Sequence, residues 1–458
     1  MKLAQRKELK LNLANETEIY LADYITNEVT EDETTRERAK EILFDTIGVM
    51  SAGSKTTEAK IVAKIAKSEM PGDVPLLGGG SASLWGATLA NSASSYCLDL
   101  DAVYEPSTLH IAAILTPLIL TLATKYKLTL REVIDAFHVG YNVAASFGDS
   151  LTSKEMYSRY FHPTAIAGAF GASAASSRII CKKKECALNS LRLVSLMASG
   201  LTTVFNEQLH QSAPMQVANS AFSGIRATVL ANEGINGPPL FYKKSVFYPF
   251  SGKEGVAPEF ELVRKLTDDR AELKTSFKRH SACLFLQSGV DAALELRDEI
   301  GTPTEGDKID LIVDPAIVDL IDNAGDVTHN AQLVISMAFN YGKVNYEDFA
   351  KALDDANILR TKKNISILRD QSLLGHYPTS LPSIIRITSV DGKVHEARVE
   401  YHKGHSKNPM SLDDLRTKFE NLVNIKDRDA QLKLDSIFFG DEDADFSETL
   451  SLIKRASK

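Results

Sequence analysis

Cysteine is scarce in this chain of 458 residues, which contains only Cys97, Cys181, Cys186 and Cys283. These four form no C-x-x-C pair, so their spacing predicts neither a zinc site nor an iron–sulfur cluster. The histidines form no H-E-x-x-H or similar local pair. A disulfide framework is not expected, because such frameworks are typical of small, cysteine-rich secreted domains. We therefore expect no metal and no other cofactor.

Long basic runs and apolar runs of membrane length are also missing. The formal net charge is -8, which argues against nucleic acid and anionic membranes as partners. The longest apolar run, Ile111–Thr124, is shorter than a membrane span and contains Pro117. The N-terminal residues lack the apolar stretch of a signal peptide. These absences predict a soluble cytoplasmic protein, and a hydrophobic fraction of 44% is ample for a large core.

Helical periodicity dominates the first part of the chain. Helices are expected at Asn15–Val29, Thr34–Met50, Ala59–Lys67, Leu84–Asp99, His110–Tyr126, Leu130–Asp149, Thr164–Ile180, Glu185–Gly200 and Pro214–Ala231. The segment Thr164–Ser177 is unusually rich in alanine and glycine. Because so little side-chain bulk lets neighbouring backbones approach closely, we expect this helix at the centre of its domain.

The pattern changes after about Phe250, where strands begin to alternate with helices. Strands are expected at Lys308–Val313, Ser383–Ser389 and Lys393–Tyr401, and helices at Cys283–Glu299, Thr328–Asn340 and Tyr346–Leu353. The turn Val390-Asp391-Gly392 is a strong hairpin signal between the last two strands. Helical patterns return at Ser411–Leu422 and Ser447–Arg455. A mixed α/β region therefore follows a helical one.

The stretch from Asn91 to His110 is the first candidate for chemistry. Asn91, Ser95 and Asp99 lie four residues apart, so a helix would place them on one face, with Asp101 close behind. Polar side chains beside such apolar sequence need a partner or a ligand. The alternative is a helix end with solvated acids and a capping His110.

Two further places carry titratable residues. His162 precedes Pro163, which suits the first turn of a helix, so His162 is either an acid or base or only a cap. Lys278 and Arg279 can clamp a carboxylate, although a basic pair in a surface loop is the commoner case. Cys283 either lines the site or, as we favour, is simply buried. Together these residues suit metal-free proton abstraction next to a carboxylate.

Six motifs in order resemble those of the MmgE/PrpD family over nearly the whole chain. They are Leu98-Asp99-Leu100-Asp101-Ala102, then His110 with Pro117, Arg159-Tyr160-Phe161-His162-Pro163-Thr164, Phe277-Lys278-Arg279, Asp291-Ala292-Ala293-Leu294, and Gly404-His405-Ser406-Lys407-Asn408-Pro409-Met410-Ser411. The resemblance implies a mainly α fold, in which a large all-helical domain carries a smaller inserted α/β lid (an α+β unit). We expect the helical domain at residues 1–268, the lid at 269–403, and a C-terminal segment at 404–458 that returns to the helical domain.

The resemblance also implies a homodimer and a metal-free site between the helical domain and the lid. The expected activity is that of a cofactor-free lyase, a dehydratase or decarboxylase, acting on a small polycarboxylate. An epimerase remains an alternative, because all three reactions share an enolate-like intermediate. His162 or Asp99 would take the proton, His110 would donate one, and Lys278 would hold a carboxylate. The expected substrate-binding residues are Asn91, Asp101, Arg279, Gln211, Ser212, Gln216 and Cys283.

The sequence departs from the family pattern at several positions. Ala102 and Val103 stand where the family has Asp and Thr, Ala213 and Gln216 where it has Lys and His, and Met337 where it has Tyr; a lid His is replaced by Cys283 or Gln287. The loss of a cation and a proton donor motivates a second hypothesis from another class. In that hypothesis the protein binds a metabolite or a partner without turning it over.

Overall fold

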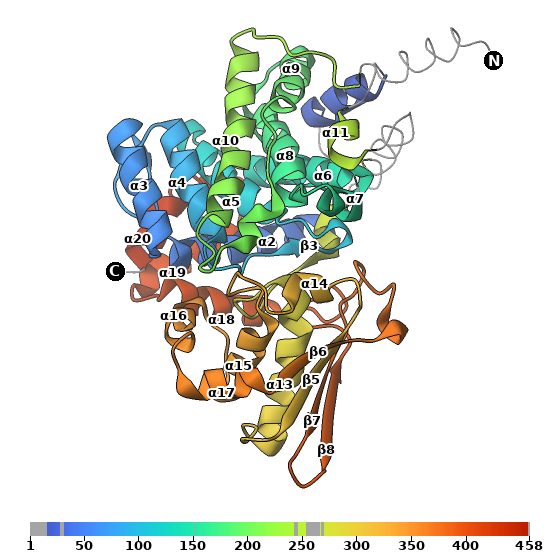
Figure 1. The fold of residues 1–458 in the computed structure, drawn as a ribbon. Helices are drawn as coiled ribbons and strands as arrows, with labels where there is room; N and C mark the ends of the chain where they lie inside the picture. The colour runs from blue at the N-terminus through green and yellow to red at the C-terminus, as the bar shows by residue number, and fades with distance from the viewer. Residues whose placement is uncertain are drawn as a thin grey trace, which may run out of the picture.

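The computed structural model describes residues 16–27, 32–151, 153–241, 246–252, 266 and 270–456. Figure 1 shows a helical domain in blue to green with the C-terminal helices in red beside it, and a smaller yellow-to-orange lid below. Each part has its own hydrophobic core. The first core combines residues up to Phe277 with residues from Met410 onward, and the second spans Ala282–Val399 together with Val103. The predicted fold class, a mainly helical protein with a smaller α/β part, is confirmed.

The helical domain is built mainly from helices. They are α2 (Glu33–Gly53), α3 (Thr57–Glu69), α4 (Leu84–Tyr96), α5 (Ile111–Tyr126), α6 (Leu130–Leu151), α7 (Ser153–Ser158), α8 (Pro163–Ile180), α9 (Lys184–Val194), α10 (Ala213–Asn232) and α11 (Phe247–Ser251). A further helix covers residues 16–26. Short 3-10 helices lie at Glu105–Ser107, Thr202–Asn206 and Ala271–Lys274, and the strands β1 (Val74–Pro75) and β2 (Ser81–Ala82) pair antiparallel.

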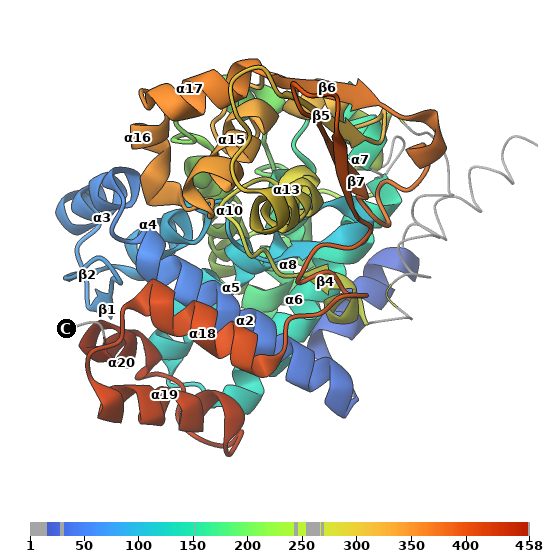
Figure 2. The same cartoon turned by 90° about the horizontal axis from the view of Figure 1, so that it is seen from below.

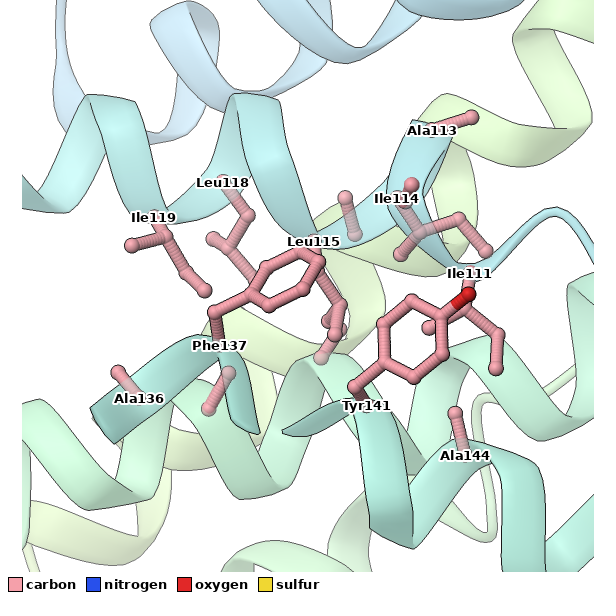
Figure 3. Packing of buried hydrophobic residues seen from close by; sticks show 14 of the residues in the cluster. Ile111, Ala113, Ile114, Leu115, Leu118, Ile119, Ala136, Phe137, Tyr141 and Ala144 are labelled. Atoms are coloured by element: carbon pink, nitrogen blue, oxygen red, sulfur yellow. The ribbon is translucent and has the colours of Figure 1, made fainter. Parts of the chain in front are cut away.

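Helix α8, with its small side chains, lies at the centre of the domain, as predicted. It packs against α5, α6, α9 and α10, and Figure 3 shows the neighbouring layer, where Phe137 and Tyr141 of α6 lie against α5. A Cβ built on Gly171 would lie 2.6 Å from the carbonyl oxygen of Gly140 and 2.7 Å from the Cβ of Ala144. The α6–α8 contact is therefore so close that it excludes even a methyl group at this position.

The lid is a four-stranded sheet with helices packed against it. Its elements are α13 (Gln287–Ile300), β5 (Lys308–Val313), α14 (Val318–Ile321), α15 (Ala331–Tyr341), α16 (Phe349–Ala352), α17 (Ala356–Lys363), β6 (Ile365–Arg369), β7 (Ser383–Thr388) and β8 (Val394–Val399), with 3-10 turns at Leu284–Leu286, Tyr346–Asp348 and Gln371–Leu373. The strand order is β6-β5-β7-β8, parallel between β5 and β6 and antiparallel elsewhere. The sequence predicted β5 and the β7–β8 hairpin, but it missed β6, a short edge strand whose residues are mostly exposed.

The C-terminal segment returns to the helical domain through α18 (Leu412–Val423), α19 (Arg428–Phe439) and α20 (Thr449–Ala456). Figure 2 shows α18 lying along α2. The ring of Phe419 stacks on Phe44 with a centroid distance of 4.1 Å. The Lys418 Nζ lies 2.7 Å from the buried Asp45 carboxylate. This last segment is thus part of the first core and not of the lid.

Hydrogen bonds to Glu105 join the three parts of the chain. Its carboxylate accepts hydrogen bonds from the Ser276 hydroxyl at the entry to the lid and from the Ser406 backbone N–H (3.1 Å) and hydroxyl (3.0 Å) after the lid. Beside it, β3 (Val103–Tyr104) pairs with β4 (Thr275–Ser276). The stretch from Asp99 to His110 therefore lies directly under the lid.

A disulfide joins Cys181 and Cys186 across the turn between α8 and α9, with a Cα–Cα distance of 5.6 Å. The sequence did not predict this bond, because a five-residue spacing in a turn has no distinctive pattern. Cys97 and Cys283 are buried free thiols. Among the helices of the described residues, none combines the length and the hydrophobicity that a membrane crossing requires.

The close approach of α6 and α8 predicts that Gly171→Ala destabilises the protein by about 1–3 kcal/mol, as overpacking does. Chemical denaturation followed by circular dichroism measures this. The matched control is Gly78→Ala, because a Cβ at exposed Gly78 meets nothing closer than 3.6 Å and should cause no loss. Equal stability of both variants would contradict the packing described for α8.

Candidate active site

Asp99 adopts a different backbone from the one predicted. Helix α4 ends at Tyr96, and Asp99 follows in the left-handed region with φ 47°. Asp99 therefore does not share a helix face with Asn91 and Ser95. The Asn91 amide instead accepts a hydrogen bond from Leu77 N and donates to Pro75 O and Thr121 Oγ1. The structure does not bring Asn91 into the cluster described below.

A buried ion pair connects the helical domain to the start of the lid. The Lys278 Nζ donates to the Asp99 carboxylate and, at 3.0 Å, to the Asp99 carbonyl oxygen. Burial alone would raise the pKa of Asp99, but the Lys278 ammonium together with His210, His329 and His110 outweighs it and lowers that pKa to about 2. Asp99 is thus an ionised partner of Lys278, while the three N–H donors of Lys278 leave one for a ligand.

His110 lies beside this pair, at the N-terminus of α5. Its Nδ1 donates to Asp101 Oδ2 at 2.9 Å, which fixes the ring and leaves Nε2 for a reacting group. Asp99 Oδ2 and Asp101 Oδ1 are buried and have no hydrogen-bond partner among the described residues. Buried carboxylate oxygens without a donor cost free energy, so this place favours a ligand that carries hydrogen-bond donors.

His162 precedes α8 as predicted, with Pro163 in the first turn, but its side chain makes no capping hydrogen bond. Its Nδ1 donates to Gln216 Oε1 at 2.5 Å, and Gln216 Nε2 in turn donates to Leu201 O. Burial lowers the pKa of His162 to about 3, against the opposing effect of the Gln216 hydrogen bond. The ring is therefore neutral near pH 7 and presents the lone pair of Nε2.

A second histidine–aspartate pair was missed by the sequence analysis. His210 Nδ1 donates to Asp326 Oδ2 at 2.7 Å, and both side chains are fully buried. Asp326 also accepts hydrogen bonds from the backbone N–H and the hydroxyl of Thr328, both at 2.8 Å, and lies 3.6 Å from His329. These residues belong to irregular loops before α10 and α15, where no periodicity marks them.

Two aromatic rings connect the histidines into one cluster. Tyr96 lies between His110 and His210, with centroid distances of 4.8 and 5.4 Å. Phe205 lies between His162 and His329, at 5.2 and 4.9 Å. The catalytic candidates Asp99, His110, His162 and Lys278 therefore meet at one place, together with His210, Asp326 and His329. We call this set the histidine cluster.

Besides Asn91, three more of the expected substrate-binding residues lie outside the histidine cluster. Arg279 is exposed, and its backbone N–H donates a hydrogen bond to Gln287 Oε1. Gln211 is exposed, and its side-chain amide donates a hydrogen bond to the Glu58 carboxylate. Ser212 is exposed, and its backbone N–H donates to the Glu207 carboxylate. Neighbouring residues of an irregular loop point in different directions, which the sequence could not indicate.

Cys283 lies at the edge of the histidine cluster, whereas Met337 lies in the lid core. Cys283 is buried and its backbone N–H donates to Thr328 O, which brings it to the edge of the histidine cluster. Burial and then Asp99 raise the pKa of the Cys283 thiol, so it stays protonated. Met337 is part of the lid core. The family Tyr at that position is thus replaced by a packing residue.

Asp99, Asp101 and His110 also form the kind of set that can hold a metal ion. Their donor atoms all lie within 4.8 Å of one another. However, Lys278 already bonds to Asp99, and a divalent cation next to this ammonium would be repelled. The residues therefore fit a site whose positive charge comes from the chain itself.

Comparisons with known proteins found matches over most of the chain. Residues 20–254 match the MmgE/PrpD N-terminal domain, and residues 280–437 match the MmgE/PrpD C-terminal domain. The chain is similar to cis-aconitate decarboxylase of Mus musculus, with 23% identity over 83% of this chain and 81% of the mouse protein. It is also similar to cis-aconitate decarboxylase of Homo sapiens, with 25% identity over 84% and 82% of the two chains.

The lowered pKa of His162 predicts an acid-sensitive stability. The unfolded chain binds a proton near pH 6.5 and the folded chain only near pH 3, so the contribution of His162 is lost as pH falls through this window. Between pH 6.5 and 5 the loss amounts to about 2 kcal/mol. His162→Gln should flatten this part of the stability curve, measured by denaturant unfolding at each pH. Parallel curves for the variant and the parent would contradict a neutral, buried His162.

Proposed function

The chain belongs to the MmgE/PrpD family, and we propose that it is a cofactor-free lyase that acts on a small polycarboxylate. The observation that carries the proposal is the Lys278–Asp99 pair beside the His110–Asp101 pair, both at the boundary between the helical domain and the lid. A buried cation next to oriented imidazoles suits a reaction that develops negative charge next to a carboxylate.

Lys278 binds a substrate carboxylate with its remaining N–H. Because Asp99 and its carbonyl oxygen hold the other two donors, the ammonium cannot rotate away from this direction. As the carboxylate takes up the charge of the adjacent carbanion, the fixed ammonium stabilises the resulting enolate. Asp99 is the orienting partner of Lys278 and not the base, because its carboxylate and its carbonyl oxygen are both bonded to that ammonium.

His162 takes the proton where the reaction removes one. Its neutral ring presents Nε2, and Gln216 fixes its orientation through Nδ1. His110, held by Asp101, delivers a proton to the leaving group or to the carbanion. Two imidazoles with separate hydrogen-bonded partners allow one to act as base and the other as acid.

Decarboxylation is the first candidate because both relatives are named cis-aconitate decarboxylase. Dehydration is the second, and a specific observation favours it. Asp99 Oδ2 and Asp101 Oδ1 lack hydrogen-bond donors among the described residues, and a substrate hydroxyl would supply one. A substrate with carboxylates and an alkene alone has no such donor unless a carboxyl group is protonated.

Binding without turnover is the third possibility, motivated by Ala213 and Gln216. Ala213 is fully buried at the start of α10 and contributes no charge. Gln216 nevertheless bonds to His162, so the replacement leaves this histidine oriented. The homodimer and the cytoplasmic location expected from the sequence remain predictions.

Turnover of a panel of di- and tricarboxylates in deuterated water tests the proposal. Nuclear magnetic resonance reads loss of CO2, loss of water and deuterium uptake at carbon in one experiment. We expect one of the first two for the true substrate. His110→Asn should lower kcat roughly a hundredfold or more, as for a lost acid or base, and Lys278→Met should also raise KM. His376→Asn, which changes a half-buried histidine of the lid outside the cluster, is the matched control.

The outcomes separate the alternatives. Deuterium uptake without a net product would indicate an epimerase. Ligands that raise the melting temperature while neither product nor deuterium appears would contradict the lyase and support a protein that only binds. Full activity of the His110 and Lys278 variants would exclude the site.

A further inference from the structure

His210 offers a buried hydrogen-bond donor that the proposed reaction does not use. Its ring is fully buried, and Asp326 of the lid occupies Nδ1. Nε2 is also buried and has no hydrogen-bond partner among the described residues. The backbone of His210 lies in the left-handed region with φ 52°, which is uncommon for a residue with a side chain. The fold thus fixes the position of this ring although the backbone conformation of His210 is unfavourable.

Several contacts hold the His210 loop against the lid. Val327 N donates to Gln208 O at 3.1 Å, and the Tyr346 hydroxyl donates to Leu209 O at 3.4 Å. Asp326 cannot turn away from His210, because Thr328 bonds to its other oxygen. The His210 ring is therefore fixed beside Tyr96, whose other neighbour is the ring of His110.

The charged groups around His210 are mostly acidic. Asp326 faces it from the lid, Asp99 from the segment after α4, and Glu207 from its own loop. Burial lowers the pKa of His210, but these carboxylates, with Asp326 the strongest, raise it overall to about 9. At neutral pH the ring is an imidazolium whose Nε2–H has no acceptor among the described residues.

We propose that His210, oriented by Asp326, is a second carboxylate-binding cation of the histidine cluster and holds the substrate carboxylate that Lys278 does not. The inference rests on the proposed function in one respect, that the cluster binds a carboxylated ligand. Its physical basis is a charge count. Lys278 is already matched by Asp99, so one ammonium alone holds a dicarboxylate poorly, whereas an imidazolium with a free N–H supplies the second donor.

In this proposal the site recognises two carboxylates of one ligand. A ligand with a carboxylate at each end satisfies Lys278 and His210 together. A ligand with one carboxylate leaves a buried N–H without an acceptor and loses affinity for that reason. His210 is thus a binding residue, and Asp326 is a positioning residue that acts through it.

Nuclear magnetic resonance of the full chain with 15N-labelled histidine tests this directly. Succinate and its monoamide, succinamate, are the probes, because they have the same length and differ by one charge. We expect the His210 Nε2 signal to show an imidazolium at pH 7 and to shift on addition of succinate. Titration calorimetry should show that the parent binds succinate at least tenfold more tightly than succinamate.

His210→Gln should remove this preference. We expect the affinity for succinate to fall tenfold or more and the affinity for succinamate to change less than threefold. Asp326→Asn should weaken succinate in the same direction and lower the pH at which the His210 signal titrates. His376→Gln is the control outside the cluster. If His210 and Asp326 had a purely structural role, the variants would lower the affinity for both probes equally.

Equal weakening, or a His210 signal that succinate does not move in the parent protein, would overturn the proposal. The second readout needs no variant, so a His210 substitution that fails to fold does not weaken the test. Neither experiment measures turnover. An inactive protein that still prefers succinate through His210 would contradict the lyase and support this inference, and an active protein without the preference would do the reverse.

Discussion

The buried ion pair of Lys278 with Asp99 is the contact on which the candidate site depends. Both side chains are almost fully buried, and taking two charges out of water is costly unless each is well bonded. The left-handed backbone at Asp99 meets this condition for two of the three Lys278 N–H donors, because it presents the carbonyl oxygen as well as the carboxylate to the same ammonium. The third donor and Asp99 Oδ2 are left for a ligand. Lys278 comes from the entry to the lid and Asp99 from the helical domain, so the pair forms only when these parts are together.

The other contacts of the cluster follow the same division. Asp326 belongs to the lid and His210 to the helical domain, and a backbone hydrogen bond between Val327 and Gln208 runs beside them. His110 and His162, by contrast, precede two helices of the helical domain and are oriented from within it. The helical domain thus supplies the acid and base of the proposed reaction, while the lid side supplies Lys278 and the carboxylate that orients His210.

Much of this fold was predictable from the sequence, and the reason is local. Helical periodicity marked α5 and α6, the Ala/Gly-rich run marked the central α8, and Val390-Asp391-Gly392 marked the lid hairpin. The candidate site was predictable only in part. His162 follows from its position before Pro163, whereas His210 and Asp326 meet across 116 residues of chain in loops without a pattern. Asn91 does not join the cluster, because its amide is bonded to β1 and α5, and Asp99 leaves the helix face of Asn91 because α4 ends at Tyr96.

A double-mutant cycle on Asp99 and Lys278 tests the central claim most directly. Breaking a buried ion pair leaves one charge without a partner, so Asp99→Asn and Lys278→Met should each lower the free energy of unfolding by roughly 3–5 kcal/mol. The double variant leaves no unpaired charge, and it should be more stable than the sum of the two single losses predicts. Strictly additive losses would show that the two residues do not interact, and would contradict a site assembled by this pair.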